Sequence, residues 1–192
     1  MPRAAPPAAG PGSAGTHVVL LRGVNVGGKN KLPMRELVAL LQAAGGEEVR
    51  TYIQSGNAVL KASPAVARRL PAALAARIEA RLGLRVPVIV RTAGALREVA
   101  RQHPFQGLEA VPALLQVAFL ADEPTPAAVR ALDPQRSPPD QLVVRGREVY
   151  LWFPNGSARS RLTTDYLDRT LGTTSTWRNW RTVQELAALL AG

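Results

Sequence analysis

The chain has 192 residues, of which 46% are hydrophobic, so it can bury a sizeable core as one compact domain or as two small ones. It has no cysteine and only two histidines, which excludes disulfides, thiolate nucleophiles, zinc–thiolate sites and a histidine cage, and we predict no metal and no cofactor. The net charge of +10 favours an anionic partner such as nucleic acid or a phosphate-bearing small molecule, although the codon bias of a GC-rich genome explains the excess of arginine equally well.

The sequence shows no pattern for membrane insertion or export. No apolar run approaches the roughly 18–20 residues that span a bilayer, and the first residues lack the charged and then apolar pattern of a secretory signal. We therefore predict a cytoplasmic protein without membrane contact. Residues 1–15 are mostly Pro, Ala and Gly, so burial cannot offset their ordering entropy, and we predict a disordered tail.

Residues 16–103 have the hydrophobic pattern of a β-α-β-β-α-β unit followed by a linker helix. Pro33 suits a first helical position, and Gly83 is typical of a helix end. Pro71 should kink or restart the second helix, and Pro87 predicts that the last strand is a sheet edge. The predicted elements are strands at 17–22, 49–53, 58–61 and 86–91, helices at 33–44 and 64–82, and the linker helix at 95–102.

Residues 104–192 repeat this element order without obvious sequence identity. The predicted elements are strands at 114–120, 142–145, 148–153 and 174–178, helices at 126–132 and 157–171, and a C-terminal helix at 182–190. Thr182 and Glu185 form a capping-box pair at the start of that last helix. The predicted fold is therefore α+β, with two ferredoxin-like subdomains packed together, and packing between them explains Tyr150 and Trp152 better than stacking on RNA does.

Several segments resemble the signature segments of the bacterial domain-of-unknown-function 1697 (DUF1697) family. They are LRGVNVGGKNK at 21–31, RTYIQSGN at 50–57, RSRL at 159–162, WRNWRTV at 177–183 and, more weakly, HPF at 103–105. Arg161 stands where the family pattern leads us to expect lysine. The resemblance spans the chain from about residue 17 onward and implies a fold with two ferredoxin-like subdomains. It implies no reaction.

The loop at 23–31 comes close to the phosphate-binding pattern G-x-x-x-x-G-K-[ST]. Gly23, Gly28 and Lys29 are in place, but Asn30 stands where a hydroxyl should bind Mg²⁺. Pro33 pushes the residue before it out of the helical region, so the helix starts too late for a true P-loop. We therefore predict that this loop is not the phosphate loop of a nucleoside triphosphatase.

A less specific anion-binding site at the same loop is an alternative interpretation. Backbone N–H groups near Gly27 and Gly28 could face an anion, with added charge from Arg22, Lys29 and Lys31. Alternatively, the glycines only permit a tight crossover with positive φ. Polar groups at Asn25, Gln54, Ser55 and Asn57 could line a site, but turn chemistry explains the last three at least as well.

The segment at 178–181 has two interpretations. Asn179 could cap the last helix while Trp180 packs beneath it. Alternatively, Trp180 could stack on a base while Arg178 and Arg181, which flank it, grip phosphate. Asp165 and Asp168 are predicted to form a solvated, salt-bridged face with Arg161 and Arg169.

Our first hypothesis is a binding module for a phosphate-bearing ligand such as nucleic acid or a nucleotide. The alternatives are a small-molecule enzyme, with the loops at 23–31 and 54–57 and Asn179 forming one polar pocket, and a protein-interaction scaffold. No pair of nucleophile and base is identifiable, so no catalytic residue is predicted. We expect the two loops to lie close together. The predicted ligand-binding residues are Arg22, Asn25, Gly27, Gly28, Lys29, Lys31, Gln54, Ser55, Asn57, Arg178, Asn179 and Trp180.

Overall fold

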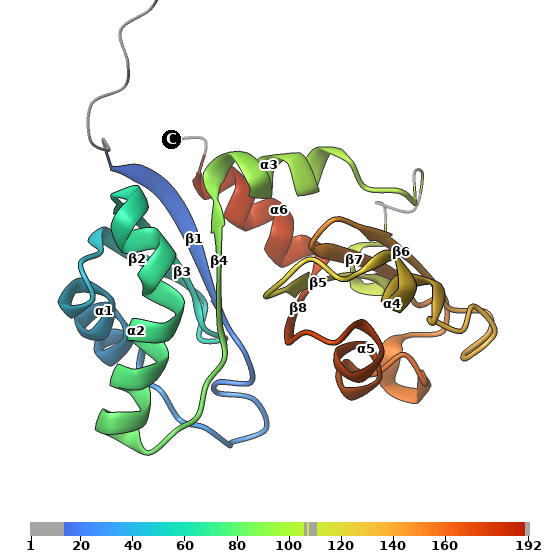
Figure 1. Ribbon diagram of the computed structural model, residues 1–192, viewed down its shortest axis with the longest axis horizontal. Helices are drawn as coiled ribbons and strands as arrows, with labels where there is room; N and C mark the ends of the chain where they lie inside the picture. Colours follow the sequence, from blue (N-terminus) through green and yellow to red (C-terminus); the bar gives the residue numbers. More distant parts are fainter. Residues whose placement is uncertain (1–13, 106, 108–110, 191–192) are drawn as a thin grey trace, which may run out of the picture.

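The computed structural model describes residues 14–105, 107 and 111–190, and it shows a mixed α+β protein with two four-stranded antiparallel sheets (Figure 1). The α+β class predicted from the hydrophobic pattern is therefore confirmed. Most of the predicted tail at 1–15 lies outside the described residues, and Gly15 is already the first residue of a strand.

The first sheet has the strand order β2-β3-β1-β4, so β2 and β4 are its edges. Its strands are β1 (Gly15–Leu21), β2 (Glu47–Tyr52), β3 (Asn57–Ala62) and β4 (Val88–Thr92). Two helices, α1 (Met34–Ala43) and α2 (Pro64–Leu82), cover one face of this sheet with buried leucine and isoleucine side chains. We call β1–β4 with these two helices the first unit.

The second sheet has the order β6-β7-β5-β8, in which β6 and β8 are edges. Its strands are β5 (Leu115–Leu120), β6 (Gln141–Arg145), β7 (Glu148–Trp152) and β8 (Ser175–Asn179). Two short helices, α4 (Pro126–Arg130) and α5 (Thr164–Leu171), lie on its outer face. We call these elements the second unit.

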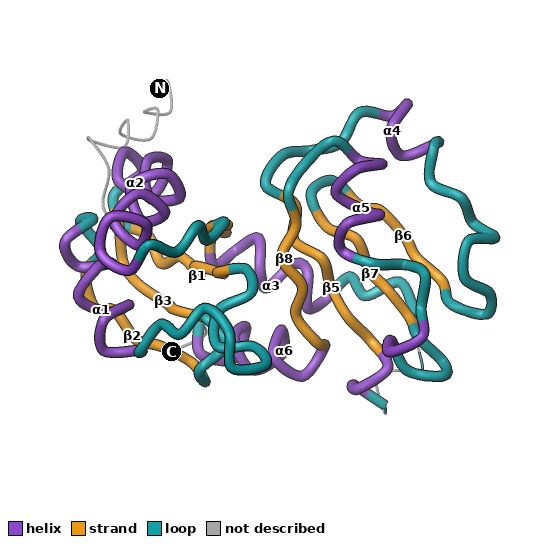
Figure 2. Tube along the Cα trace, turned by 90° about the horizontal axis from the view of Figure 1, so that it is seen from below, coloured by secondary structure: helices purple, strands orange, loops and turns teal. Residues whose placement is uncertain are grey.

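Two further helices, α3 (Ala93–Arg101) and α6 (Trp180–Leu189), lie between the sheets (Figures 1 and 2). Their buried faces join the inner faces of both sheets in one apolar cluster, which includes Leu20 from β1, Phe119 from β5 and Tyr150 from β7. The two units therefore share a core, and the packing interpretation of Tyr150 is confirmed. Edge strand β8 is the part of the second sheet nearest the first unit (Figure 2).

Of the two predictions that depend on proline, one is confirmed and the other is wrong in part. Pro87 immediately precedes edge strand β4, which confirms the edge prediction because a proline there removes no ladder hydrogen bond. Of the kink or restart predicted at Pro71, the restart is wrong, since α2 is one helix from Pro64 to Leu82 and buries Leu70 and Leu74 on both sides of that proline.

Two helix starts differ from the predictions. The helix expected from residue 157 begins at Thr164, where the Thr163 side chain accepts a hydrogen bond from Tyr166 N, and only a short 3-10 turn occupies Ser157–Arg159. The capping box at Thr182 is also wrong. α6 begins at Trp180, and Asn179 is its cap because Asn179 Oδ1 accepts a 2.8 Å hydrogen bond from Thr182 N.

No helix in the described part of the chain is both long and apolar enough to cross a membrane.

Gly56, in the turn between β2 and β3, is required by its surroundings. Its φ is +75°, and an added Cβ would lie 2.4 Å from Val24 Cγ2 and 2.8 Å from Leu21 Cβ. Gly56→Ala should therefore lower the free energy of unfolding by about 2 kcal/mol in urea denaturation. Gly146→Ala is the matched control, because Gly146 has φ +55° but no atom within 4 Å of an added Cβ, so the loss there is about 1 kcal/mol or less. Equal losses at the two turns would contradict the steric argument.

Candidate functional site

Arg178 lies on β8 and reaches into the first unit. Its side chain is buried, with 8% of the residue exposed. Nη2 donates hydrogen bonds to Leu21 O at 2.7 Å and Gly56 O at 3.2 Å, and Nε donates to Asn57 Oδ1. One arginine thus links the end of β1 and the β2–β3 turn to the second sheet.

All acceptors around Arg178 are neutral. The remaining contacts run from Nη1 to Thr176 Oγ1 and Trp177 O, and from Nη2 to Ser55 O. In the described part of the chain, no carboxylate forms a salt bridge with this guanidinium. Burial lowers the pKa of Arg178 from its usual value to about 10, because removal from water disfavours the charged form. The group is still protonated at neutral pH.

Arg91 on β4 holds the corresponding place in the first unit. Both arginines directly precede the residue that caps the following helix, namely Thr92 before α3 and Asn179 before α6. Arg91 donates to Leu120 O at the end of β5 and to Arg147 O in the β6–β7 turn. Two pseudo-equivalent arginines therefore link the units, because each donates hydrogen bonds to backbone carbonyls of the other unit.

The two junctions differ in one acceptor. Arg91 Nε donates to Glu148 Oε1 at 2.8 Å in a salt bridge, whereas Arg178 Nε donates to the amide oxygen of Asn57. Glu148 and Asn57 each begin the third strand of their unit. Burial lowers the pKa of Arg91 as well, but the hydrogen bond to Glu148 opposes that shift. The positive charge is therefore compensated at Arg91 and uncompensated at Arg178.

A groove of about 660 Å³ opens beside Arg178, where the loop after β1 and the β2–β3 turn meet the second sheet. We call it the junction groove. Of the predicted site residues, it brings together Arg22, Ser55, Arg178 and Asn179. Its other lining residues are Gly23, Val26, Ile53, Gln116, Thr164, Ser175, Thr176, Trp177 and Thr182.

Two helix N-termini lie at this groove. Thr164 is the first residue of α5, and Thr182 lies in the first turn of α6. Both residues line the groove. The N-terminal end of a helix carries a partial positive charge. Asp165 in the first turn of α5 opposes that charge, so Arg178 and the α6 end are the features that favour an anion in this space.

Arg22 makes a bridging ion pair rather than a free contact for a ligand. Its guanidinium donates to Asp168 Oδ2 and lies 3.6 Å from Asp165 Oδ1. Asp168 also accepts hydrogen bonds from Ser175 N at 2.9 Å and Ser175 Oγ at 2.6 Å. The prediction that these aspartates pair with arginines of their own helix is therefore wrong, because the cross-unit geometry brings Arg22 to them first.

The loop at 23–31 and the β2–β3 turn are close, as expected, and Asn25 joins them. Asn25 Nδ2 donates to Gln54 O at 2.7 Å and to Leu32 O at 2.8 Å, while Asn25 Oδ1 accepts from Leu32 N. Lys29 N already donates to Val26 O, so this N–H does not face an anion. The side chain of Asn25 thus holds the loop in shape, consistent with its crossover interpretation.

The remaining predicted residues lie elsewhere. Asn25, Gly28, Lys31 and Gln54 line a separate hollow of about 600 Å³ beside α1. Gly27 and Lys29 are exposed in the loop and line neither cavity. Asn57 is fully buried under Arg178. The enzyme hypothesis placed these polar side chains in one pocket. In the structure they are divided between two cavities and the protein interior.

Trp180 is a core residue. It is 2% exposed, and its ring lies 4.3 Å from that of His103, centroid to centroid. Stacking on a base would require unpacking this cluster. Sequence reasoning missed Trp177 instead, which is half-buried, lines the junction groove and donates from Nε1 to Ser175 Oγ at 3.0 Å. The sequence held a signal for Trp177. Side chains alternate along a strand, so Trp177 and Arg178 of β8 point to opposite faces of the sheet and both needed to be considered.

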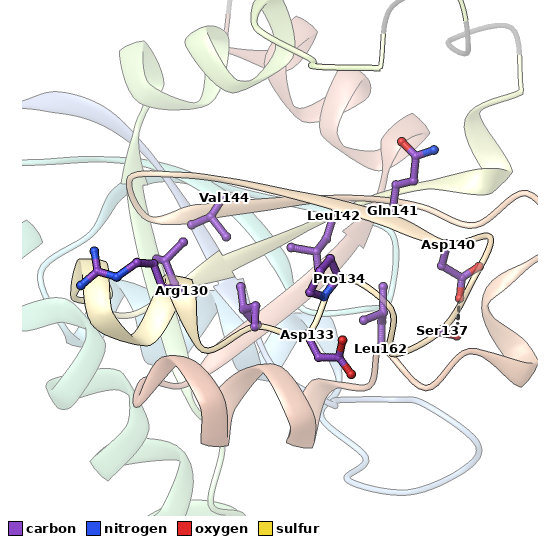
Figure 3. Close-up of a pocket in the computed structure, with 11 residues that line it drawn as sticks. Arg130, Asp133, Pro134, Ser137, Asp140, Gln141, Leu142, Val144 and Leu162 are labelled. Carbon is purple, nitrogen blue, oxygen red and sulfur yellow. Dashed lines mark hydrogen bonds between the residues drawn. The ribbon is translucent and has the colours of Figure 1, made fainter.

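A further cavity of about 530 Å³ lies within the second unit, between α4 and β6. Figure 3 shows the apolar side chains of Leu142, Val144 and Leu162 along it, with Arg130 pointing away from them. Ser137 Oγ donates to Asp140 Oδ2, so these polar groups satisfy each other. This cavity has no buried unpaired charge among its lining residues, and the junction groove is the stronger candidate.

Comparisons with known proteins place the chain in a family. The family model described as "Protein of unknown function (DUF1697)" matches residues 15–150, and the chain therefore belongs to the DUF1697 family. Among solved structures, it is similar to the conserved bacterial protein SP0830 from Streptococcus pneumoniae, with a TM-score of 0.65 and 21% identity, covering 93% of this chain and 99% of that one. This likeness shows the fold alone. No curated protein gives a significant match.

Proposed function

We propose that this member of the DUF1697 family binds a small phosphate-bearing ligand in the junction groove. The observation that supports this most is Arg178, a buried guanidinium that lines the groove and has only neutral hydrogen-bond acceptors. Burial of an unpaired charge is costly in the free protein, and an anion nearby offsets that cost.

Arg178 acts through its charge and not through a direct contact, because its N–H groups already have acceptors. Two unit charges about 6 Å apart attract by about 3 kcal/mol at an effective dielectric constant of about 20. Direct contacts come from the side chains of Ser55, Gln116 and Thr164, which line the groove and carry hydroxyl and amide groups. The ligand thus meets neutral donors beside the buried positive charge of Arg178.

The groove favours a small molecule over nucleic acid. Its volume of about 660 Å³ is within the usual range of small-molecule sites, roughly 300–1,000 Å³. A nucleic-acid site needs several cations that follow the phosphate backbone. Here Lys29 and Lys31 lie outside the groove, and Arg22 pairs with two aspartates.

We also propose that the two halves are ferredoxin-like subdomains, at 16–103 and 104–192. The order β-α-β-β-α-β in each half, with the first and third strands central in each sheet, supports this assignment.

Titration calorimetry with AMP tests the proposed function. We expect binding at about 20 mM NaCl that weakens as salt is raised, because the attraction is electrostatic. Gln116→Glu, which is isosteric, puts a negative charge in the groove and should weaken binding about tenfold. Gln141→Glu on β6 changes the net charge equally but outside the groove, so its affinity should match that of the unmodified chain. Equal weakening by both variants, or no binding at low salt, contradicts the proposal.

A further inference from the structure

The rim of the junction groove exposes large apolar side chains. In the part of the chain that the structure describes, the exposed large hydrophobic residues are Val26, Ile53, Val111 and Leu189. Val26 is 61% exposed and Ile53 is 51% exposed, and these two line the same groove from different loops. A single exposed apolar side chain needs no explanation, but two at the mouth of one cavity mark an apolar contact surface.

Ile53 is held in a strained conformation. Its φ is +49°, in the left-handed region that a β-branched residue rarely adopts. The corresponding turn of the second unit has Gly146 at φ +55°. Because half of Ile53 is exposed, packing within the protein does not compensate fully for this strain. Asparagine would adopt the same backbone with less strain, so the isoleucine side chain serves something other than folding.

Trp177 supplies a fixed aromatic ring on the second unit's side of the groove. Its Nε1–H donates to Ser175 Oγ, and its ring stacks against Phe153 with an interplanar angle of 23°. These contacts hold the indole orientation before a ligand arrives, so little side-chain entropy is lost on binding.

We propose that the ligand of the junction groove carries a flat aromatic ring as well as its phosphate, as a nucleoside monophosphate does, and that Ile53, Val26 and Trp177 contact the faces and edge of that ring. The inference rests on the proposed function and adds the chemical class of the ligand. Arg178 and the N-terminus of α6 attract the phosphate, and the apolar rim and the indole select for the ring.

The test compares three probes by titration calorimetry, namely inorganic phosphate, ribose phosphate and AMP. We expect AMP to bind at least about tenfold more tightly than ribose phosphate, since one stacked ring contributes a difference of that size. Ile53→Asn should raise the Tm by about 2–4 °C through relief of strain, while AMP affinity falls toward that of ribose phosphate, because Ile53 is one of three contacts to the ring. Ribose phosphate should bind this variant as it binds the unmodified chain.

The outcomes separate the two proposals. If ribose phosphate and AMP bind equally well, or if Ile53→Asn leaves their ratio unchanged, the ring contact is wrong and the phosphate site stands. A Tm that falls in Ile53→Asn means that the side chain serves folding, which also overturns the inference. If none of the three probes binds, the proposed function itself is wrong.

Discussion

Replacing Arg178 by methionine should lower the free energy of unfolding by about 3–5 kcal/mol. Six hydrogen bonds from this side chain end on acceptors in both units, and methionine donates none of them. The acceptors include Leu21 O and Gly56 O, which are buried and would lose a partner. Removal of an uncompensated charge recovers part of the loss, so the net effect stays below the sum of the bonds.

Urea denaturation gives the measurement, and Arg69→Met gives the control. Arg69 is exposed on α2 and donates to Ala65 O of its own helix, so its replacement should change the free energy of unfolding by at most about 0.5 kcal/mol. If Arg178→Met is as stable as the unmodified chain, the desolvation cost cancels the hydrogen bonds. Arg178 would then not be what holds the β1 end and the β2–β3 turn to β8.

The element order was predictable because it depends on local signals. Short apolar runs between glycine and proline turns mark the strands, and Pro87 favours an edge position for the strand beside it. The helix starts were less predictable. Thr163 and Asn179 compete with neighbouring Ser, Thr and Pro residues as caps, and the choice depends on where the adjoining strand ends.

The candidate site was predictable only in part, because its contacts join residues far apart in the chain. Arg22 pairs with Asp168 and Arg178 reaches Leu21 O, and no local pattern shows which carboxylate or carbonyl an arginine will meet. One signal was present: an arginine directly before a capping Thr or Asn occurs at the last strand of both halves, at Arg91 and Arg178. That repeat predicts equivalent roles, and the difference between Glu148 and Asn57 appears only when the two junctions are compared in space.

Changing Asn57 to aspartate should abolish most of the affinity for AMP, with a loss of about 100-fold. The new carboxylate takes the place of the amide oxygen beside Arg178 Nε, as Glu148 does beside Arg91. Two opposite unit charges about 4 Å apart attract by about 4 kcal/mol at an effective dielectric constant of about 20. The new carboxylate at position 57 therefore compensates the Arg178 charge that attracts the ligand. Titration calorimetry at low salt measures the loss.

Stability separates this effect from misfolding. Asn57 Nδ2 donates to Tyr52 O and Ser55 Oγ, and aspartate loses both bonds, while the new ion pair with Arg178 offsets them. We therefore expect the free energy of unfolding of Asn57→Asp to stay within about 2 kcal/mol of the unmodified value.

The reverse change at the other junction is the matched control. Glu148→Gln leaves Arg91, 2% exposed, without its carboxylate, and should lower the free energy of unfolding by about 2–3 kcal/mol. It should not change AMP affinity, because neither Arg91 nor Glu148 lines the junction groove. If Asn57→Asp folds and still binds AMP as the unmodified chain does, the charge of Arg178 is not what attracts the ligand. If Glu148→Gln weakens binding as much as Asn57→Asp, the effect is one of stability and not of the site.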